Sequence, residues 1–157
     1  MSYPSDLYEQ ILAEEAELRL DSFGVDDAWV LGAQMRRVAA ERSLPVAIGI
    51  VLGQQRVFHA ALPGSSADND EWLARKTAVV LRYGRSSLGV GEQFRVQGKD
   101  FDVDGRLDTD RFAAHGGVFP LVLRRGGALL GAVGVSGLPQ RDDHAFVVEQ
   151  LRNFIAA

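Results

Sequence analysis

The chain has 157 residues, of which 46% are apolar and 24% are charged, and it contains no cysteine. This length and balance indicate one globular domain, residues 1–157, with a substantial core. The lack of cysteine excludes disulfides, thiol nucleophiles and zinc–thiolate sites. A net charge of −4 and a pI of about 5.3 argue against a nucleic-acid partner, which requires a broad basic surface.

The apolar segments are too short to cross a bilayer, since the nearest one, 126–137, is brief and rich in glycine. Residues 1–6 also lack the charged and apolar regions of a signal peptide. We therefore expect a cytoplasmic protein without a membrane partner.

The first 42 residues predict two amphipathic helices, over about 5–20 and 26–42, with a break at Ser22-Phe-Gly. Ser5 suits the N-cap of the first helix, and Asp26 and Asp27 suit the positive N-terminal end of the second. The apolar stripes expected to face the core are Leu7, Ile11 and Leu18 in the first helix and Leu31, Met35 and Val38 in the second.

Beyond Pro45, which ends the second helix, the pattern changes to β structure. Residues 46–52 and 56–60 are rich in β-branched and aromatic side chains, and the turn Gly53-Gln-Gln separates them. This segment therefore predicts a β-hairpin.

A third helix is predicted over about 68–83, and Gly84 is placed to end it. The stretch 86–104 predicts a short helix followed by irregular chain. Residues 108–115 predict another short helix, which the two glycines after His115 would end.

A second hairpin is predicted over 118–124 and 128–135, followed by a last helix that starts near Asp142. The order of helices and hairpins predicts an α+β fold in which helices flank an antiparallel sheet, and it disfavours a doubly wound dinucleotide fold. The glycine-rich segment 126–137 matches neither the Rossmann nor the P-loop pattern, so we interpret it as a closely packed hairpin. The side chains expected to dock the last helix are Val147, Val148, Leu151, Phe154 and Ile155.

The third helix carries a lysine within an apolar stripe. Trp72, Lys76, Val79 and Tyr83 follow one another at i, i+4, i+7 and i+11, and a buried ammonium without a partner is costly. Lys76 must therefore snorkel to the surface, pair with a carboxylate or face an anionic ligand. It belongs to a local basic cluster that can hold a small anion and consists of Arg75, Lys76, Arg82 and Arg85.

His115 precedes two glycines in Ala114-His-Gly-Gly-Val-Phe-Pro120. Gly116 and Gly117 permit unusual backbone angles and the close approach of another group. The imidazole can then ligate a metal or donate a proton near neutral pH. Alternatively, it hydrogen-bonds a neighbouring turn while Phe119 packs in the core.

A further polar group follows the second hairpin. Ser136 and Gly137 end the strand, and Asp142 or Asp143 is placed to cap the last helix, whose free N–H groups can bind an anion or the aspartate itself. The helix dipole disfavours the protonated form of His144 in the first turn. A neutral imidazole suits a metal or haem iron, and it equally suits a buried core position.

Ser136, Asp143 and the histidines supply the atoms of a catalytic triad, but the sequence has no G-x-S-x-G elbow and no parallel scaffold to present it. His59, His115 and His144 also lack the short spacing of a strong metal motif. Hydrolysis and direct metal binding are therefore disfavoured. A redox enzyme would need a bound cofactor and turnover, which no residue pattern demands.

Four separated motifs resemble one branch of the haem-degrading-domain family, which includes GlcG-like and haem-binding HbpS-like proteins. The likeness spans about residues 5–155, and the strand 131–137 with the aspartates after it resembles the family's closing signature. The motifs are Trp72 to Lys76, Arg82-Tyr-Gly-Arg-Ser-Ser87, His115-Gly-Gly-Val-Phe-Pro120 and Ser136-Gly-Leu-Pro-Gln-Arg-Asp-Asp-His144. The resemblance implies a profilin-like three-layer fold, closed homo-oligomers, and a ligand that is haem in some relatives and corrinoid-related in others.

We therefore expect a binding domain for haem or another anionic small molecule, with its pocket between the sheet and the third and last helices. In this hypothesis His115 or His144 contacts the cofactor, the cations neutralise its carboxylates, and the aromatic side chains form apolar walls. The alternative is a non-enzymatic oligomeric scaffold without a cofactor, in which Lys76 is ion-paired. The expected ligand-binding residues are Trp72, Lys76, Arg82, Tyr83, Arg85, His115, Gly116, Gly117, Phe119, Ser136, Asp143 and His144.

Overall fold

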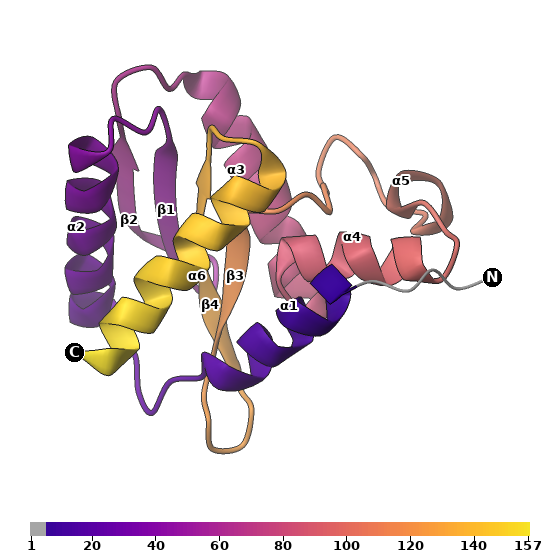
Figure 1. Ribbon diagram of the computed structural model, residues 1–157, viewed down its shortest axis with the longest axis horizontal. Helices are drawn as coiled ribbons and strands as arrows, with labels where there is room; N and C mark the ends of the chain where they lie inside the picture. The colour runs from indigo at the N-terminus through magenta and orange to yellow at the C-terminus, as the bar shows by residue number, and fades with distance from the viewer. Residues whose placement is uncertain (1–5) are drawn as a thin grey trace.

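A computed structural model describes residues 6–157 as a four-stranded sheet between two layers of helices (Figure 1). The strands lie in the order β2-β1-β4-β3, and every neighbouring pair is antiparallel. The predicted α+β class and both hairpins are confirmed. The strands are β1 (Ala47–Leu52), β2 (Gln55–Ala61), β3 (Val118–Val122) and β4 (Leu129–Ser136).

The helices begin and end close to the predicted bounds. Gly84 adopts the left-handed conformation, with φ of 67°, and ends α3 as predicted. The first helix is shorter than expected because Leu20 pairs with Leu123 in an isolated β-bridge. Ser5, the expected cap of that helix, lies outside the described residues. The helices are α1 (Asp6–Glu17), α2 (Val25–Glu41), α3 (Ala67–Tyr83), α4 (Ser87–Val96), α5 (Phe101–Asp104) and α6 (Gln140–Ala156).

The prediction of a helix over 108–115 is wrong. Only a single turn forms, in which the N–H of Phe112 donates to the carbonyl of Asp108 (3.0 Å). The next N–H, that of Ala113, donates instead to the carbonyl of Arg75 in α3 (3.2 Å). Phe112 is buried in a small core beneath α3 and α4, and this tertiary packing overrides the local preference.

The main core lies on the face of the sheet that α2 and α6 cover. Because strand side chains alternate, Ile48 and Ile50 of β1 point into this core. Gly49 points to the opposite face, where a Cβ atom would come within 2.9 Å of the Leu73 side chain of α3. Small residues on that face therefore let α3 pack closely on the sheet.

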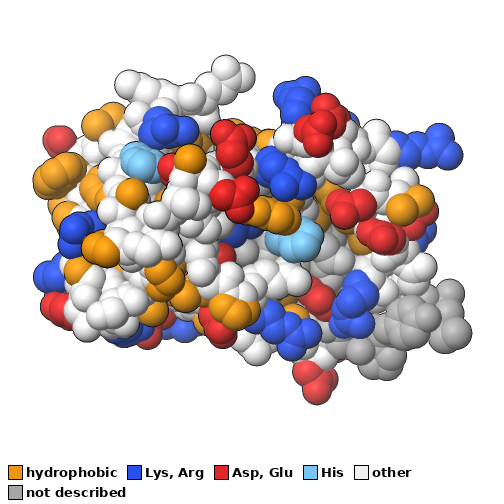
Figure 2. Space-filling model, turned by 90° about the horizontal axis from the view of Figure 1, so that it is seen from above, with side chains coloured by type: hydrophobic (Ala, Val, Ile, Leu, Met, Phe, Trp, Pro, Cys, Tyr) orange, Lys and Arg blue, Asp and Glu red, His pale blue; other side chains and the backbone are white. Residues whose placement is uncertain are grey.

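The loops that join β2 to α3 and β4 to α6 lie at one end of the sheet (Figure 1). Figure 2 looks onto this end, where acidic and basic side chains surround a histidine near its middle. Within residues 6–157, no helix combines the length and the apolar character needed to span a membrane.

Candidate functional site

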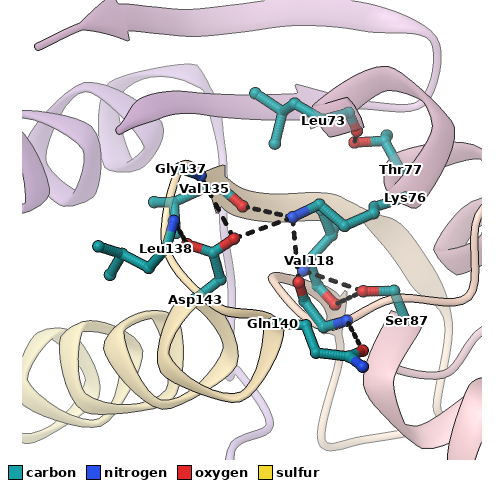
Figure 3. A network of polar contacts seen from close by, with 11 residues as sticks. Leu73, Lys76, Thr77, Ser87, Val118, Val135, Gly137, Leu138, Gln140 and Asp143 are labelled. Carbon is teal, nitrogen blue, oxygen red and sulfur yellow. Dashed lines mark hydrogen bonds and ion pairs between the residues drawn. The ribbon is translucent and has the colours of Figure 1, made fainter. Parts of the chain in front are cut away.

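Lys76 joins three parts of the chain at this end of the sheet. The residue is 2% exposed, and its ammonium donates to the carbonyls of Gly116 (3.0 Å) and Val135 (2.9 Å) and to Oδ2 of Asp143 (3.2 Å) (Figure 3). These contacts use all three donors of the ammonium. Of the three possibilities for Lys76, the structure therefore contains the ion pair with a carboxylate.

Asp143 connects the same network to the start of α6. Its Oδ1 accepts from the N–H of Leu138 (3.0 Å), and its Oδ2 accepts from the N–H of Gly137 (3.4 Å) (Figure 3). Burial lowers the pKa of Lys76 and raises the pKa of Asp143, and their mutual attraction only partly opposes both shifts. The pair thus links α3 and α6, which lie on opposite faces of the sheet, and removing both charges from water opposes its formation.

The glycines after His115 are required by this packing. Gly117 has φ of 138°, and a Cβ atom there would lie 2.5 Å from Nζ of Lys76 and 2.6 Å from the carbonyl oxygen of Val135. A Cβ atom on Gly116 would collide with the carbonyl of Gln140. The close approach predicted from the two glycines is therefore present at both positions.

Two adjoining hollows open beside the network. The smaller, of about 270 Å³, has Lys76 and Asp143 among its lining residues. The larger, of about 350 Å³, is lined in part by Arg95 and Lys99. The hollows share His115 and Gln140. The other principal side chains around the smaller hollow are Asp68, Asn69, Trp72, Ser136 and Leu138, and those around the larger include Leu88, Glu92 and Phe101.

His115 is exposed between these hollows. Its ring meets Trp72 edge-on, with centroids 5.3 Å apart, and the guanidinium of Arg75 lies 4.4 Å from the centroid of the same indole. Among the described residues, no hydrogen bond or ion pair reaches this imidazole. Its nitrogens are therefore available to a ligand in either hollow.

His144 lies elsewhere. It is 3% exposed, its Nε2 is 2.8 Å from Oε1 of Glu14 in α1, and its ring lies 6.0 Å from that of Phe119. Neither His144 nor Phe119 lines the hollows beside His115. The structure therefore does not bring the two imidazoles to one cavity, and His144 occupies a buried core position.

Three further predicted residues also lie away from the hollows. The Arg82 guanidinium is 5.9 Å from the ring centroid of Phe112, and Tyr83 packs edge-on against Phe101 at 6.2 Å. Arg85 forms an ion pair with Glu15 of α1 (2.6 Å). The predicted residues that meet around the smaller hollow are Trp72, Lys76, His115, Gly116, Ser136 and Asp143, with Gly117 against Lys76.

The sequence of residues 23–152 matches the family model described as haem degrading protein HbpS-like. The chain belongs to the HbpS-like family. This HbpS-like chain is 54% identical over 144 residues to a UPF0303 protein of Streptomyces coelicolor, covering 90% of each chain. It is 45% identical over 156 residues to a UPF0303 protein of Rhizobium etli, covering 99% of this chain and 93% of the relative. The family expected from the four motifs is confirmed.

Solved structures share the HbpS-like fold. The crystal structure of the Ybr137w protein superposes with a TM-score of 0.86 at 30% identity, covering 96% of this chain and 89% of that chain. HbpS itself gives 0.65 at 15% identity, covering 87% and 94%. A PduOC:heme complex gives 0.64 at 20% identity, covering 85% and 95%. The last two comparisons support the fold alone.

Sequence reasoning missed several contributors to the candidate site. Gln140 accepts from the N–H of Gly116 through Oε1 (3.0 Å) and lines both hollows, yet it falls within an ordinary helix start. Arg95 and Lys99 lie within 86–104, where the sequence predicts a short helix followed by irregular chain, so no periodicity placed them beside His115. Among the described residues, no group of three His, Asp or Glu side chains is arranged to hold a metal ion.

Proposed function

We propose that this HbpS-like chain is a small-molecule binding domain of a closed homo-oligomer, which holds haem or another anionic cofactor beside His115. The observation that carries the proposal is the exposed imidazole between two adjoining hollows. The ring contacts Trp72 edge-on, and a ligand does not have to displace a hydrogen-bond partner of the ring.

The side chains around His115 suit an iron porphyrin. A neutral imidazole is a common iron ligand, Lys99 can pair with a carboxylate, and Leu88 and Phe101 offer apolar contacts. Arg95 lines the same hollow but is already paired with Glu92 (2.8 Å). Bound haem would supply the redox chemistry of its iron. The PduOC:heme complex, which shares the fold, supports haem as the first ligand to test.

The volumes of the hollows limit how such a ligand can lie. They measure about 270 and 350 Å³, so one lies below and the other near the lower end of the range of about 300–1,000 Å³ for small-molecule sites. A tetrapyrrole would therefore need more space than either hollow alone provides.

Lys76 and Asp143 have a positioning role in this proposal. The bond from Lys76 to the carbonyl of Gly116 fixes the backbone directly after His115. Since all donors of Lys76 are used, it does not need to contact the ligand. His144 is held by Glu14 and takes no part.

Haem titration followed by absorbance tests the proposal, with His115→Ala as the variant and Arg125→Ala as the control. Arg125 is exposed in the turn between β3 and β4 and lines neither hollow. We expect wild type and Arg125→Ala to give the same Soret band at stoichiometric haem, and His115→Ala to bind at least about tenfold more weakly. No spectral change in the wild type, or equal binding by His115→Ala, would overturn haem binding at this site.

A second candidate function is an oligomeric scaffold without a cofactor. It is favoured by one observation, that Lys76 and Gly117 have complete structural explanations in the packing of α3 and α6. Sizing chromatography with light scattering separates the two functions. A wild-type oligomer that binds no haem, together with a Lys76→Ala variant that dissociates, would favour the scaffold.

A further inference from the structure

One edge of the sheet is closed by the chain itself. At β3, the hydroxyl of Ser87 donates to the carbonyl of Val118 (3.3 Å) and accepts from its N–H (3.1 Å). The N–H of Leu20 donates to the carbonyl of Val122 (2.9 Å), and Pro120 has no N–H to leave unpaired. A further strand therefore cannot add at this edge.

The opposite edge, β2, is open. Its backbone pairs with β1 on the inner side, and within residues 6–157 no backbone hydrogen bond reaches it from the outer side. The strand contains no proline, and Arg56 near one end is its only Lys, Arg, Asp or Glu. A bulge between Arg56 and Phe58 shifts the register with β1, so the regular part of the open edge is 58–61. Such an edge is a template for pairing with another chain.

Beside this edge, α2 presents an apolar flank. Trp29 is 67% exposed, Ala33 and Ala40 on the same side of the helix are also exposed, and the Trp29 ring meets Phe58 of β2 with centroids 5.9 Å apart. The groove between the flank and β2 measures about 620 Å³, more than either hollow beside His115. In Figure 2 most of the apolar side chains lie toward the left, the side on which Figure 1 draws α2 and β2. An apolar patch next to an open edge marks an interface between proteins.

The pattern along α2 is complementary to itself. Asp26 lies in the first turn and Arg36 near the other end, and both are exposed. Trp29 and Ala33 lie between them, and both pairs are centred on position 31. If two α2 helices cross antiparallel at this level, Asp26 faces Arg36 of the partner subunit twice, and Trp29 packs against a small residue. The opposed helix dipoles are also favourable in this arrangement.

We propose that β2 and the outer flank of α2 form a two-fold interface with a second copy of this chain. The two β2 strands pair antiparallel, so that the sheet continues across the interface, and the flanks of α2 cover the groove on each side. Such an isologous contact uses the same patch on both subunits, as the symmetric charge pattern requires. The inference rests on the homo-oligomeric part of the proposed function and names its surface.

The test compares two identical substitutions, Ala33→Asp at the interface and Ala13→Asp on α1 as the matched control. Both alanines are exposed on helices, and only Ala33 lines the groove. Light scattering and sedimentation over a range of concentrations give the dissociation constant. We expect wild type and Ala13→Asp to agree, and Ala33→Asp to raise the dissociation constant at least about 30-fold, because a carboxylate would be buried where the two α2 helices cross.

A charge exchange gives an independent result. Asp26→Arg and Arg36→Asp should each weaken association, and the double variant should restore it because opposite charges then face each other again. Both side chains are exposed in the monomer, and circular dichroism can confirm that each variant folds. A wild type that stays monomeric would overturn the interface and the oligomeric part of the proposed function together. A stable oligomer that none of these variants weakens would overturn only the interface, and the proposed ligand site would stand.

Discussion

The replacement Lys76→Met should destabilise the protein strongly. Methionine keeps the apolar stem but leaves the buried carboxylate of Asp143 and the carbonyls of Gly116 and Val135 without their shared donor. Breaking a buried ion pair from one side costs about 3–5 kcal/mol, because the remaining charge keeps its desolvation penalty. In a domain of this length 1 kcal/mol corresponds to about 2–4 °C, so Tm should fall by about 6–20 °C.

A double-mutant cycle measures the interaction between Lys76 and Asp143. Its second substitution is Asp143→Asn, which removes the charge and keeps an oxygen for the N–H of Leu138. In the double variant Lys76→Met/Asp143→Asn neither charge stays buried. Its loss of unfolding free energy should therefore be smaller than the sum of the two single losses, by about 1–3 kcal/mol.

The cost of Lys76→Met should also depend on pH. Burial already raises the pKa of Asp143 in the folded protein, and loss of the ammonium raises it further. A carboxyl group with a raised folded pKa destabilises the protein above that pKa, and protonation relieves the effect as the pH falls. The gap between Lys76→Met and wild type should therefore narrow toward the ordinary aspartate pKa of 3.8.

Urea unfolding followed by circular dichroism at several pH values measures the loss of unfolding free energy in each variant, the interaction energy of the pair and the pH dependence of both. The control is the wild type carried through the same pH series. A cost below about 1 kcal/mol at neutral pH, or additive single and double variants, would refute the view that the ion pair holds α3 to α6.

Two further predictions concern the packing around the site. Gly117→Ala should cost at least about 2 kcal/mol more than Gly126→Ala, because both positions have positive φ but only at Gly117 would a Cβ atom meet Lys76; equal losses in thermal unfolding would contradict the crowding argument. Burial acts to raise the pKa of Glu14, but the hydrogen bond and charge of His144 lower the pKa overall. The ionised carboxylate of Glu14 therefore stabilises the fold fully above the ordinary pKa of 4.5, and this stabilisation is lost as the pH falls through the lowered pKa. Glu14→Gln should therefore cost about 1–2 kcal/mol at neutral pH, and the gap should close in acid; a gap independent of pH in urea unfolding would count against it.

Most of the fold could be predicted because its signals are local. The turn after residue 52 lies between β-rich segments, and Gly84 ends α3 because only a residue without a side chain adopts φ of 67° easily. The exception is 108–115, where burial of Phe112 decided the conformation and the local pattern predicted a helix.

The candidate site was predictable only in part. The helical period placed Lys76 on the buried stripe of α3, and the glycines after His115 predicted a close contact. Neither pattern identifies the residue that pairs with Lys76, because a buried charge is stabilised by atoms within about 3 Å in space, whatever their distance along the chain.

The sequence by itself therefore determined that Lys76 needs a partner, that the sheet is antiparallel and that helices cover it. Only the tertiary structure decided that the partner is Asp143, 67 residues away, and that His144 pairs with Glu14, 130 residues away, while His115 stays exposed. The physical reason is that helix and strand periods follow from neighbouring residues, whereas ion pairs and hollows depend on which surfaces meet when α3 and α6 close on the two faces of the sheet.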